Sequence, residues 1–289
     1  MRWLGPEELR RALPMDDAIT AMEAAFSADR ETPLRKLLGG SLFMPGRVGS
    51  TTGVKVVSIV PGNPVGVVTV FDADGSPMGM VDGSTLTSIR TGAACGLATR
   101  LLAPPEAGTL AMLGAGAMAF DQVEAVREVR PIERVIVWSR SRESAAALAG
   151  EVGGEVELDA NRAVEQADVI SCATPARQPL FSASSVGHGT HVNAVGAFTA
   201  EMAELPGGLL SEAFVVVDDL DAAAAEAGDL IRVGRVPDAT ITEVLEGVVY
   251  PLESTTVFKS VGIASQDVAA AVMALRNAAR LGIGVEFGP

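Results

Sequence analysis

A glycine turn that joins a strand-like run to a helix-like run places the strongest limit on how this chain folds. In the stretch TLAMLGAGAMAFDQ, residues 109–122, Gly114, Gly116 and Ala119 match the pattern G-x-G-x-x-[GA]. In that pattern the first glycine makes a tight turn, the second admits a pyrophosphate, and the small third residue lets the helix pack on the strand. A helix that begins near Ala117 would direct free N–H groups at the phosphates. We therefore predict a dinucleotide site here, with a purely structural tight turn as the alternative.

The chain beyond this turn alternates between strand-like and helix-like segments. Apolar runs of strand length occur at 108–114, 134–139, 168–174, 191–196, 213–219 and 255–262. Such strands, interleaved with helices, favour a parallel sheet covered on both faces. The sequence therefore predicts an α/β fold, with a Rossmann-type doubly wound parallel sheet over residues 106–263.

The other segments predict a second, smaller domain. They are helix-like at 15–26, β-type at 53–60, 66–71 and 77–82, and helix-like again at 84–103 and 264–281. Proline cannot continue a helix, so Pro104 and Pro105 mark the boundary between the domains. We expect the last helix to stop at Gly282 and to fold back on the first domain. The smaller domain is thus an α+β unit made of residues 1–105 plus 264–289.

Composition excludes several classes of partner and site. The 22 Lys and Arg against 36 Asp and Glu give a formal charge of −14, which repels phosphate backbones, so we expect no nucleic acid partner. The cysteines are Cys95 and Cys172 and the histidines are His188 and His191, which offers too few ligands for a metal site. No apolar run reaches the roughly 18 residues of a membrane helix, and the N-terminus lacks a signal-like apolar segment. We expect a cytoplasmic protein that does not enter a membrane.

The residues after the second strand of the sheet bear on the choice of dinucleotide. An NAD-preferring site usually places an acid there for the ribose 2′-hydroxyl, whereas this chain has Ser139, Arg140, Ser141 and Arg142. Two guanidinium groups and two hydroxyls suit a 2′-phosphate. The sequence therefore favours NADP(H) over NAD(H), and a solvated helix start is the alternative.

Three cations of the first domain form a possible anion site. Lys55 interrupts the apolar run GVKVVSIV, Arg90 lies among apolar residues of a helix, and Arg35 precedes the β-type runs. Each long side chain could instead extend from a surface face into solvent. Together they suit the carboxylate of a small molecule. If the Lys55 ammonium lies beside both guanidinium groups, we expect its pKa to be lowered.

Several motifs together resemble the ornithine cyclodeaminase/mu-crystallin family over nearly the whole length. They are PLRKLL, MPG, GVKVVS, TLTSIRTGAACGLA, LGAGA, HVNAVGAF, VVVDDLDAAAAEAGDL and VFKSVGIASQDVAAA. The resemblance implies a homodimer whose subunits each have a dimerisation and substrate domain and a Rossmann domain, with the active site between them. The family includes cyclodeaminases, alanine dehydrogenases and reductases of cyclic ketimines.

The resemblance also implies roles for individual residues. Arg35, Lys55 and Arg90 match the ligands of the substrate carboxylate, and Ser260 and Val261 would close the substrate site. The cofactor contacts would be Gly114, Gly116, Ala117 and Met118 at the pyrophosphate, Ser139 at the ribose, Thr174 after the third strand, and Val195, Gly196 and Ala197 near the nicotinamide.

Two departures from the family pattern affect the expected activity. Phe198 stands where the cyclodeaminase has a catalytic aspartate, and it cannot relay a proton; the connection PGNPVG, residues 61–66, is shorter than usual. We therefore expect an NADPH-dependent reductase of a 2-imino acid, either a cyclic ketimine or an imine of a 2-oxo acid with an amine. Lys55 would donate the proton or only bind the carboxylate. The alternatives are a cyclodeaminase with bound NAD, an alanine dehydrogenase-like enzyme, and an NADPH-binding, crystallin-like protein.

Other polar residues have simpler expected roles. Asp218, Asp219 and Asp221 lie at a strand end and helix start, where capping explains them as well as a cofactor contact does. His191 is expected to be a hydrogen-bonded core histidine. Asp267 is expected to be a first-turn acid of the last helix.

Overall fold

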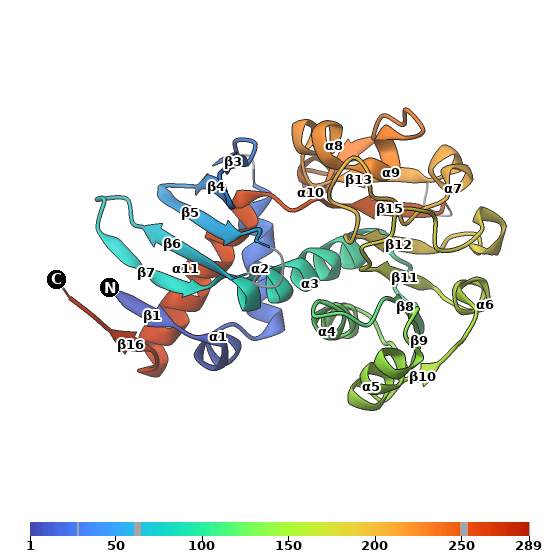
Figure 1. The fold of residues 1–289 in the computed structure, drawn as a ribbon, viewed down its shortest axis with the longest axis horizontal. Coiled ribbons are helices and arrows are strands. Elements are labelled where there is room, and N and C mark those ends of the chain that lie inside the picture. Colours follow the sequence, from blue (N-terminus) through green and yellow to red (C-terminus); the bar gives the residue numbers. More distant parts are fainter. Residues whose placement is uncertain (28, 61–64, 249–253, 289) are drawn as a thin grey trace. The chain divides into compact units, whose positions relative to one another are not determined.

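The computed structural model describes residues 1–27, 29–60, 65–248 and 254–288, and it divides into two compact units (Figure 1). Unit 1 comprises residues 1–94 and 263–289, and unit 2 comprises residues 95–262. The division falls inside helix α3, Gly83–Leu102, rather than at the Pro104-Pro105 pair. The prolines end this helix, but its last turns already belong to unit 2. A continuous helix therefore carries the chain from one unit to the other.

Unit 1 is built on a mostly antiparallel sheet. Its elements are β1 (Arg2–Leu4), α1 (Pro6–Ala12), α2 (Met15–Ala25), β2 (Arg30–Glu31), β3 (Lys36–Leu38), β4 (Ser41–Val48), β5 (Thr51–Ser58), β6 (Gly66–Phe71), β7 (Pro77–Asp82), the start of α3, α11 (Ala264–Leu281) and β16 (Val285–Glu286). The strand order is β16-β1-β7-β6-β5-β4-β2, and β3 pairs with β4. Strand β4 was not among the strands that the sequence predicted.

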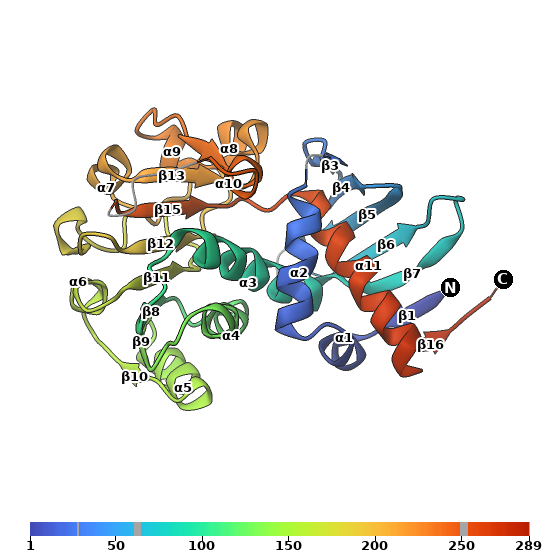
Figure 2. The same ribbon diagram turned by 180° about the vertical axis from the view of Figure 1, so that it is seen from behind.

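Helix α11 covers one face of this sheet beside α2, as Figure 2 shows. Glycines of the sheet permit the close approach: a Cβ added at Gly46 would lie 2.8 Å from Ala264 Cβ, and one at Gly53 would lie 3.0 Å from Val268 Cγ2. The last helix therefore returns to the first domain, as expected. It ends at Gly282, whose φ of 66° is the left-handed conformation that glycine adopts most easily.

Unit 2 contains the predicted alternation of strands and helices. Its elements are β8 (Thr109–Leu113), α4 (Ala119–Val129), β9 (Arg134–Trp138), α5 (Arg142–Val152), β10 (Glu155–Val156), α6 (Ala160–Glu165), β11 (Val169–Cys172), η1 (Ala183–Ser185), β12 (His191–Ala194), α7 (Gly207–Glu212), β13 (Phe214–Val217), α8 (Leu220–Glu226), α9 (Gly228–Ile231), β14 (Ala239–Thr240), α10 (Ile241–Leu245) and β15 (Thr256–Lys259).

The sheet of unit 2 is parallel throughout, in the order β10-β9-β8-β11-β12-β15-β13-β14. From β8 the chain adds β9 and β10 on one side, and then β11 and β12 on the other. This reversal is the topological switch point at which doubly wound sheets bind ligands, beyond the carboxyl ends of their strands. The predicted Rossmann-type fold is confirmed. None of the helices in the described residues is long and apolar enough to span a membrane.

Candidate functional site

The glycine turn after β8 has the shape that a pyrophosphate needs. Gly114 has a φ of 117°, and a Cβ there would lie 2.6 Å from the carbonyl oxygen of Ala173, so a larger residue is excluded on two grounds. At Gly116 an added Cβ would meet no atom within 4 Å, which leaves open space beside the backbone. Ala119 is fully buried at the start of α4. The three positions thus fit the roles of the dinucleotide motif.

Helix α4 begins two residues later than the sequence suggested. Ala117 and Met118 form the turn before its first residue, Ala119, and Ala117 is exposed. The pyrophosphate loop therefore consists of turn residues followed by a helix N-terminus, where backbone N–H groups and the helix dipole favour an anion.

The loop after β9 exposes two guanidinium groups beside that turn. Gly114 N donates a hydrogen bond of 2.8 Å to Trp138 O at the end of β9, and Ser139 follows directly. Arg140 and Arg142 are exposed. Ser141 caps α5, since its Oγ accepts a hydrogen bond from Ser144 N at 3.1 Å. The helix-start interpretation is therefore correct for Ser141 and for Arg142, the first residue of α5, although both arginines are exposed.

The other predicted cofactor residues follow the ends of β11 and β12. Thr174 is half-buried after β11, and Val195, Gly196 and Ala197 are buried after β12. Val195 N donates to Cys172 O at 3.0 Å, so the strand pairing continues into this loop. Because all these strands are parallel, their loops share one edge of the sheet with the glycine turn.

Ser260 and Val261 also lie at this edge, after β15, and a buried carboxylate holds them. Asp218 Oδ2 accepts hydrogen bonds from Ser260 Oγ at 2.7 Å, Val261 N at 3.0 Å and Gly262 N at 2.8 Å. Asp219, the next residue, caps α8 by accepting from two backbone N–H groups. The expected capping role is thus confirmed for Asp219, whereas Asp218 fixes the loop after the neighbouring strand.

Unit 1 brings two of the three predicted cations together around Asp267, which the sequence analysis expected only as a first-turn acid. Lys55, on β5, and Arg90, on α3, are each only 5% exposed. Asp267 Oδ1 accepts hydrogen bonds from Lys55 Nζ at 3.2 Å and from Arg90 Nε at 3.1 Å. Lys55 Nζ also donates to Thr87 Oγ1 at 2.7 Å. Asp267 does lie in the first turn of α11, as expected, but its function there is that of a buried counter-ion.

The pKa of Lys55 is lowered to about 8, as the sequence analysis expected, although the main cause differs. Burial is the largest cause, Asp267 opposes it, and the charges of Arg90 and Arg35 lower the pKa further. Burial by itself would raise the pKa of Asp267, but Lys55 and Arg90 hold it below its ordinary value. At neutral pH the cluster of Arg35, Lys55, Arg90 and Asp267 therefore carries more positive than negative charge.

Two polar atoms beside the cluster are buried without a hydrogen-bond partner among the described residues. They are Asp267 Oδ2 and Gln266 Nε2. The other end of the same amide, Gln266 Oε1, accepts from Arg90 Nη1 at 2.7 Å. A buried polar atom without a partner costs free energy, so an arriving polar ligand that satisfies these atoms would be stabilised.

The remaining sequence predictions have separate outcomes. His191 is a core histidine: its Nδ1 lies 2.8 Å from Thr256 Oγ1 and its Nε2 lies 3.2 Å from Asn193 Oδ1. Burial lowers its pKa to about 3, so the ring is neutral at neutral pH. Phe198 is 45% exposed in the loop that follows Ala197. Most of the shortened connection, residues 61–64, lies outside the described residues.

Sequence reasoning also missed a buried set of charges in unit 2, namely Glu204, Asp229 and Lys259. Each is at most 2% exposed. Lys259 had a detectable signal, because a charged side chain at the end of the apolar strand TTVFK is unusual, as Lys55 is within its own strand. Glu204 and Asp229 lie in loop-like and helix-like segments, where an acidic residue is ordinary.

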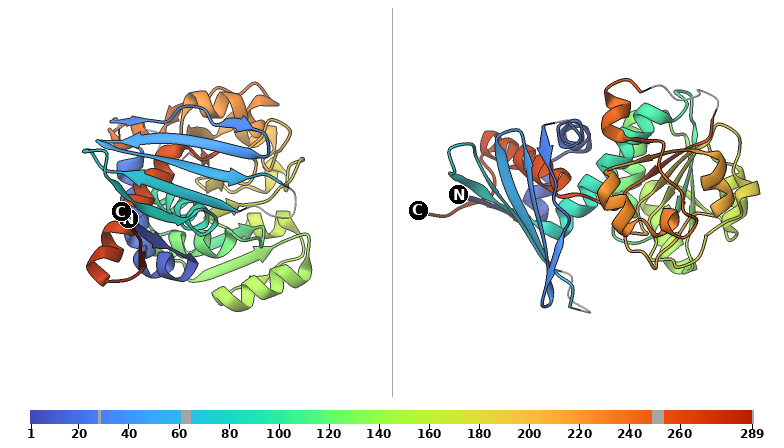
Figure 3. Two further views of the ribbon diagram at one scale, coloured as in Figure 1. Left: turned by 60° about the vertical axis from the view of Figure 1, so that its left-hand side comes forward. Right: turned by 90° about the horizontal axis from the view of Figure 1, so that it is seen from above.

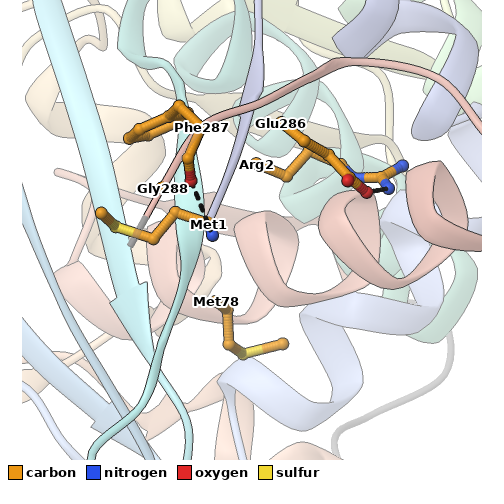
Figure 4. Close-up of a pocket in the computed structure, with 6 residues that line it drawn as sticks. All are labelled: Met1, Arg2, Met78, Glu286, Phe287 and Gly288. Carbon is orange, nitrogen blue, oxygen red and sulfur yellow. Dashed lines mark hydrogen bonds and ion pairs between the residues drawn. The ribbon is translucent and has the colours of Figure 1, made fainter.

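A pocket in unit 1, shown in Figure 4, involves none of the predicted site residues. Its lining residues come from the chain ends and β7, namely Met1, Arg2, Met78, Glu286, Phe287 and Gly288. Arg2 forms an ion pair with Glu286, and the amino group of Met1 donates to Phe287 O at 3.2 Å. These contacts join the two ends of the chain at the edge of the sheet.

Comparison with known proteins places the chain among dinucleotide enzymes. It is 36% identical to Delta(1)-pyrroline-2-carboxylate reductase of Bacillus cereus, over an alignment that covers 98% of this chain and 99% of the relative. The structure of Thermococcus litoralis Delta(1)-pyrroline-2-carboxylate reductase in complex with NADH and L-proline matches with a TM-score of 0.92 and 29% identity, over 99% of this chain and 100% of that one. An archaeal alanine dehydrogenase dimer with bound NAD also matches with a TM-score of 0.92 and 29% identity, over 100% and 99% of the two chains.

The model of the ornithine cyclodeaminase/mu-crystallin family matches residues 12–280. That span includes the cation cluster of unit 1 and the glycine turn of unit 2. The chain belongs to the ornithine cyclodeaminase/mu-crystallin family.

Proposed function

We propose that this protein is an NADPH-dependent reductase of a 2-imino acid, with a cyclic ketimine such as pyrroline-2-carboxylate or piperideine-2-carboxylate as substrate. The observation that carries the proposal is the buried cluster of Lys55, Arg90 and Asp267, whose excess positive charge suits a small carboxylate. The likeness to pyrroline-2-carboxylate reductases over nearly the full length of both chains supports the reaction type.

In this proposal the cation cluster binds and orients the substrate. The guanidinium groups of Arg35 and Arg90 and the ammonium of Lys55 hold the carboxylate, and Asp267 fixes the positions of Lys55 and Arg90. NADPH, when bound, would supply the hydride for the carbon of the C=N bond and would be oxidised to NADP⁺. The nitrogen gains one proton, which completes the amine. Orientation by the clamp supplies much of the rate acceleration.

The pKa of Lys55 makes it a suitable source of that proton. A group with a pKa of about 8 is mostly protonated at neutral pH and yet gives up its proton far more readily than an ordinary lysine. In the alternative the imine arrives already protonated and Lys55 only binds the carboxylate. Replacement of Lys55 by Met distinguishes the two: a loss confined to KM leaves Lys55 as a ligand, and a loss in kcat supports proton donation.

The preference for NADP(H) rests on the loop after β9. Arg140 in that loop and Arg142 at the start of α5 are exposed, and the loop itself, residues 139–141, offers no carboxylate to repel a 2′-phosphate. A guanidinium pairs with a phosphate through two parallel hydrogen bonds, which is the recognition that a ribose 2′-phosphate requires.

A homodimer is supported by an apolar sheet face that no helix among the described residues of unit 1 covers. Alternate residues of β4 to β7 point toward α11, and the residues between them form the opposite face, which lies in front in the left panel of Figure 3. That face carries Phe43, Val54, Val56, Val67 and Met80, all of them only partly buried. A second copy of the chain would bury these side chains, and the similar archaeal alanine dehydrogenase is a dimer.

Phe198 bears on the substrate tail. A phenyl ring cannot take the place of the carboxylate that would pair with a cationic tail, so an apolar tail fits better than the ammonium of ornithine. An amino-acid dehydrogenase remains a second candidate because of the likeness to alanine dehydrogenase.

The loss of NADPH absorbance tests the proposed function directly. The panel contains pyrroline-2-carboxylate, piperideine-2-carboxylate, and pyruvate with ammonia or methylamine, with NADH in parallel. We expect consumption with a cyclic ketimine. Consumption with only pyruvate and ammonia would favour the dehydrogenase, and ammonia release from ornithine without net cofactor consumption would favour the cyclodeaminase. Binding of NADPH without turnover of any substrate would leave a crystallin-like protein.

A further inference from the structure

The carboxylate of Glu204 joins two loops at the ligand-binding edge of the parallel sheet. Its Oε1 accepts hydrogen bonds from Thr174 N at 2.6 Å and Thr174 Oγ1 at 2.8 Å. Its Oε2 accepts from Gly196 N at 2.8 Å and Ala197 N at 3.1 Å. One side chain therefore binds the loop after β11 through one oxygen and the loop after β12 through the other.

Each of these four partners donates, so an ionised carboxylate fits the site. The Thr174 hydroxyl also accepts a hydrogen bond of 3.3 Å from Ala176 N, which directs its own proton toward Glu204. Gly196 is required at this point, because a Cβ there would lie 2.2 Å from Thr174 N and 2.5 Å from Glu204 Oε1. The two loops and the carboxylate thus pack so closely that no side chain fits at Gly196.

Asp229 binds the backbone of Glu204, and Lys259 in turn pairs with Asp229. Asp229 Oδ1 accepts from Glu204 N at 2.6 Å and from Leu205 N at 2.9 Å. Asp229 Oδ2 forms an ion pair of 2.9 Å with Lys259 Nζ, and Lys259 also donates to Ala197 O at 2.6 Å. Ala197 is therefore fixed at its N–H by Glu204 and at its carbonyl by Lys259.

The position of this network in the sheet indicates its purpose. Strand β8 with the glycine turn lies between β9 and β11, and the loop after β9 contains the residues expected at the adenosine ribose. A dinucleotide that crosses the switch point therefore has its second half beyond β11 and β12. Those are the two strands whose loops Glu204 joins.

Burying this network carries an energetic cost. Desolvation raises the pKa of Glu204, and Lys259 and the Thr174 hydrogen bonds oppose it. Two acids and one base are buried together, and hydrophobic packing could hold two loops at lower cost. Rigid placement of the loop backbone is what the charged network adds.

We propose that Glu204, held by Asp229 and Lys259, is a positioning residue for the nicotinamide end of the cofactor, acting through the backbone of Thr174, Gly196 and Ala197. The inference rests on the proposed function, since it assigns the second half of the dinucleotide to these loops. Glu204 touches neither substrate nor cofactor in this account. It sets the loop geometry that decides how close the reacting carbon atoms come.

Glu204→Gln tests the inference. An amide has one acceptor oxygen, so its NH₂ group must face the donors of one loop, and that loop is released. The matched control is Glu201→Gln, which removes the same charge three residues earlier from an exposed side chain that accepts a hydrogen bond from Thr199 Oγ1 at 2.8 Å. The probes are NADPH and adenosine 2′,5′-bisphosphate, a fragment that lacks the nicotinamide, with affinities measured by calorimetry.

We expect Glu204→Gln to weaken NADPH binding about tenfold, because the released loop must be ordered again when the nicotinamide binds, and to leave binding of the fragment unchanged. With the best ketimine, kcat should fall about 100-fold, because small misplacements of reacting groups have effects of that size. The isotope effect with NADPH deuterated at the nicotinamide C4 should rise as hydride transfer becomes rate-limiting. Glu201→Gln should resemble the unaltered protein in every measurement.

If Glu204 only stabilised the fold, Glu204→Gln would lower the affinities for NADPH and for the fragment equally, and that result would overturn the inference. Unchanged NADPH affinity and kcat would also overturn it. If Glu204→Gln does not fold, Thr174→Val and Thr174→Ser apply the same test. Both keep the backbone hydrogen bond, but only Ser keeps the hydroxyl, so the loss should be clearly larger for Val; equal losses would refute the proposal. If the unaltered protein bound neither NADPH nor the fragment, that result would instead refute the proposed function.

Discussion

Asp267→Asn is the substitution that tests the electrostatics of the cation cluster most directly. Asp267 is the acid that opposes the burial of the Lys55 ammonium, and its Oδ1 lies 3.2 Å from Lys55 Nζ. Asparagine has nearly the same shape, so the substitution removes the charge and leaves the packing. Burial, Arg90 and Arg35 then act on Lys55 unopposed, and all three lower its pKa.

The size of the effect follows from the distance. Opposite charges 3.2 Å apart attract by about 5 kcal/mol at an effective dielectric constant of about 20. The amide dipole and local relaxation recover part of this, so the pKa of Lys55 should fall by about one to three units, the usual effect of one close charge. From about 8 in the unaltered protein, it would move to neutral pH or below.

In the proposed function the protonated form of Lys55 is the active one, and this sets the sign of the pH dependence. Lys55 loses its proton as the pH rises through its pKa, so kcat/KM should decline above about pH 8 in the unaltered protein. In Asp267→Asn the decline should begin at least about one unit lower. With a fall of two units, kcat/KM at pH 7 would drop about tenfold and would recover below pH 6.

Profiles of kcat/KM against pH, measured with one ketimine, check this expectation, because the titration of the imine itself is common to all variants. Direct titration of the Lys55 ¹³Cε resonance gives the pKa without reference to activity. The control is Asp16→Asn, which removes an exposed acid from the first turn of α2. An unmoved basic limb together with an unmoved Lys55 resonance would refute the reasoning.

Three further predictions concern the cofactor, the dimer and the packing. Arg140→Asp should lower the ratio of NADPH to NADH activity at least about tenfold by repelling the 2′-phosphate; equal selectivity before and after would contradict the assignment. Val56→Asp should convert the proposed dimer to monomer in light scattering, whereas Leu158→Asp, a control at a side chain 64% exposed in unit 2, should not. Gly79→Ala should lower the free energy of unfolding by about 1–3 kcal/mol, because its Cβ would lie 2.3 Å from Arg2 O; denaturant unfolding with an unchanged midpoint would disprove this.

Local pattern was enough to predict the architecture of unit 2. Apolar runs of strand length that alternate with amphipathic runs can be recognised from short stretches of sequence, and this alternation indicates a parallel sheet. The glycine turn could also be predicted, because the conformation of Gly114 and the open space beside Gly116 are properties of a few neighbouring residues. The start of α4 was misplaced by two residues, since helix ends depend on where the turn closes.

The boundary between the units could not be predicted from local pattern. The Pro104-Pro105 pair was the strongest local breaker, but units are defined by which residues pack together, and the last turns of α3 pack within unit 2. Strand β4 was missed for a related reason. It contains Pro45 and Gly46, which are poor strand formers, and it is a strand because β5 pairs with it over its whole length.

The clusters around Lys55 and Lys259 each combine a lysine that the local sequence indicates with acids that it does not. A lysine inside an apolar strand, such as Lys55 or Lys259, indicates by itself a buried ammonium that needs a partner. Its partner can lie anywhere in the chain: Asp267 is 212 residues from Lys55, and Asp229 accompanies Lys259 from a helix of another segment. Glu204 gave no local signal at all. The sequence indicated the strands and helices of unit 2 and the cations that interrupt apolar segments, because propensity and polarity act between neighbours. Which acids meet those cations, and which loops share a carboxylate, depended on the tertiary fold, because hydrogen bonds and ion pairs depend on distance in space.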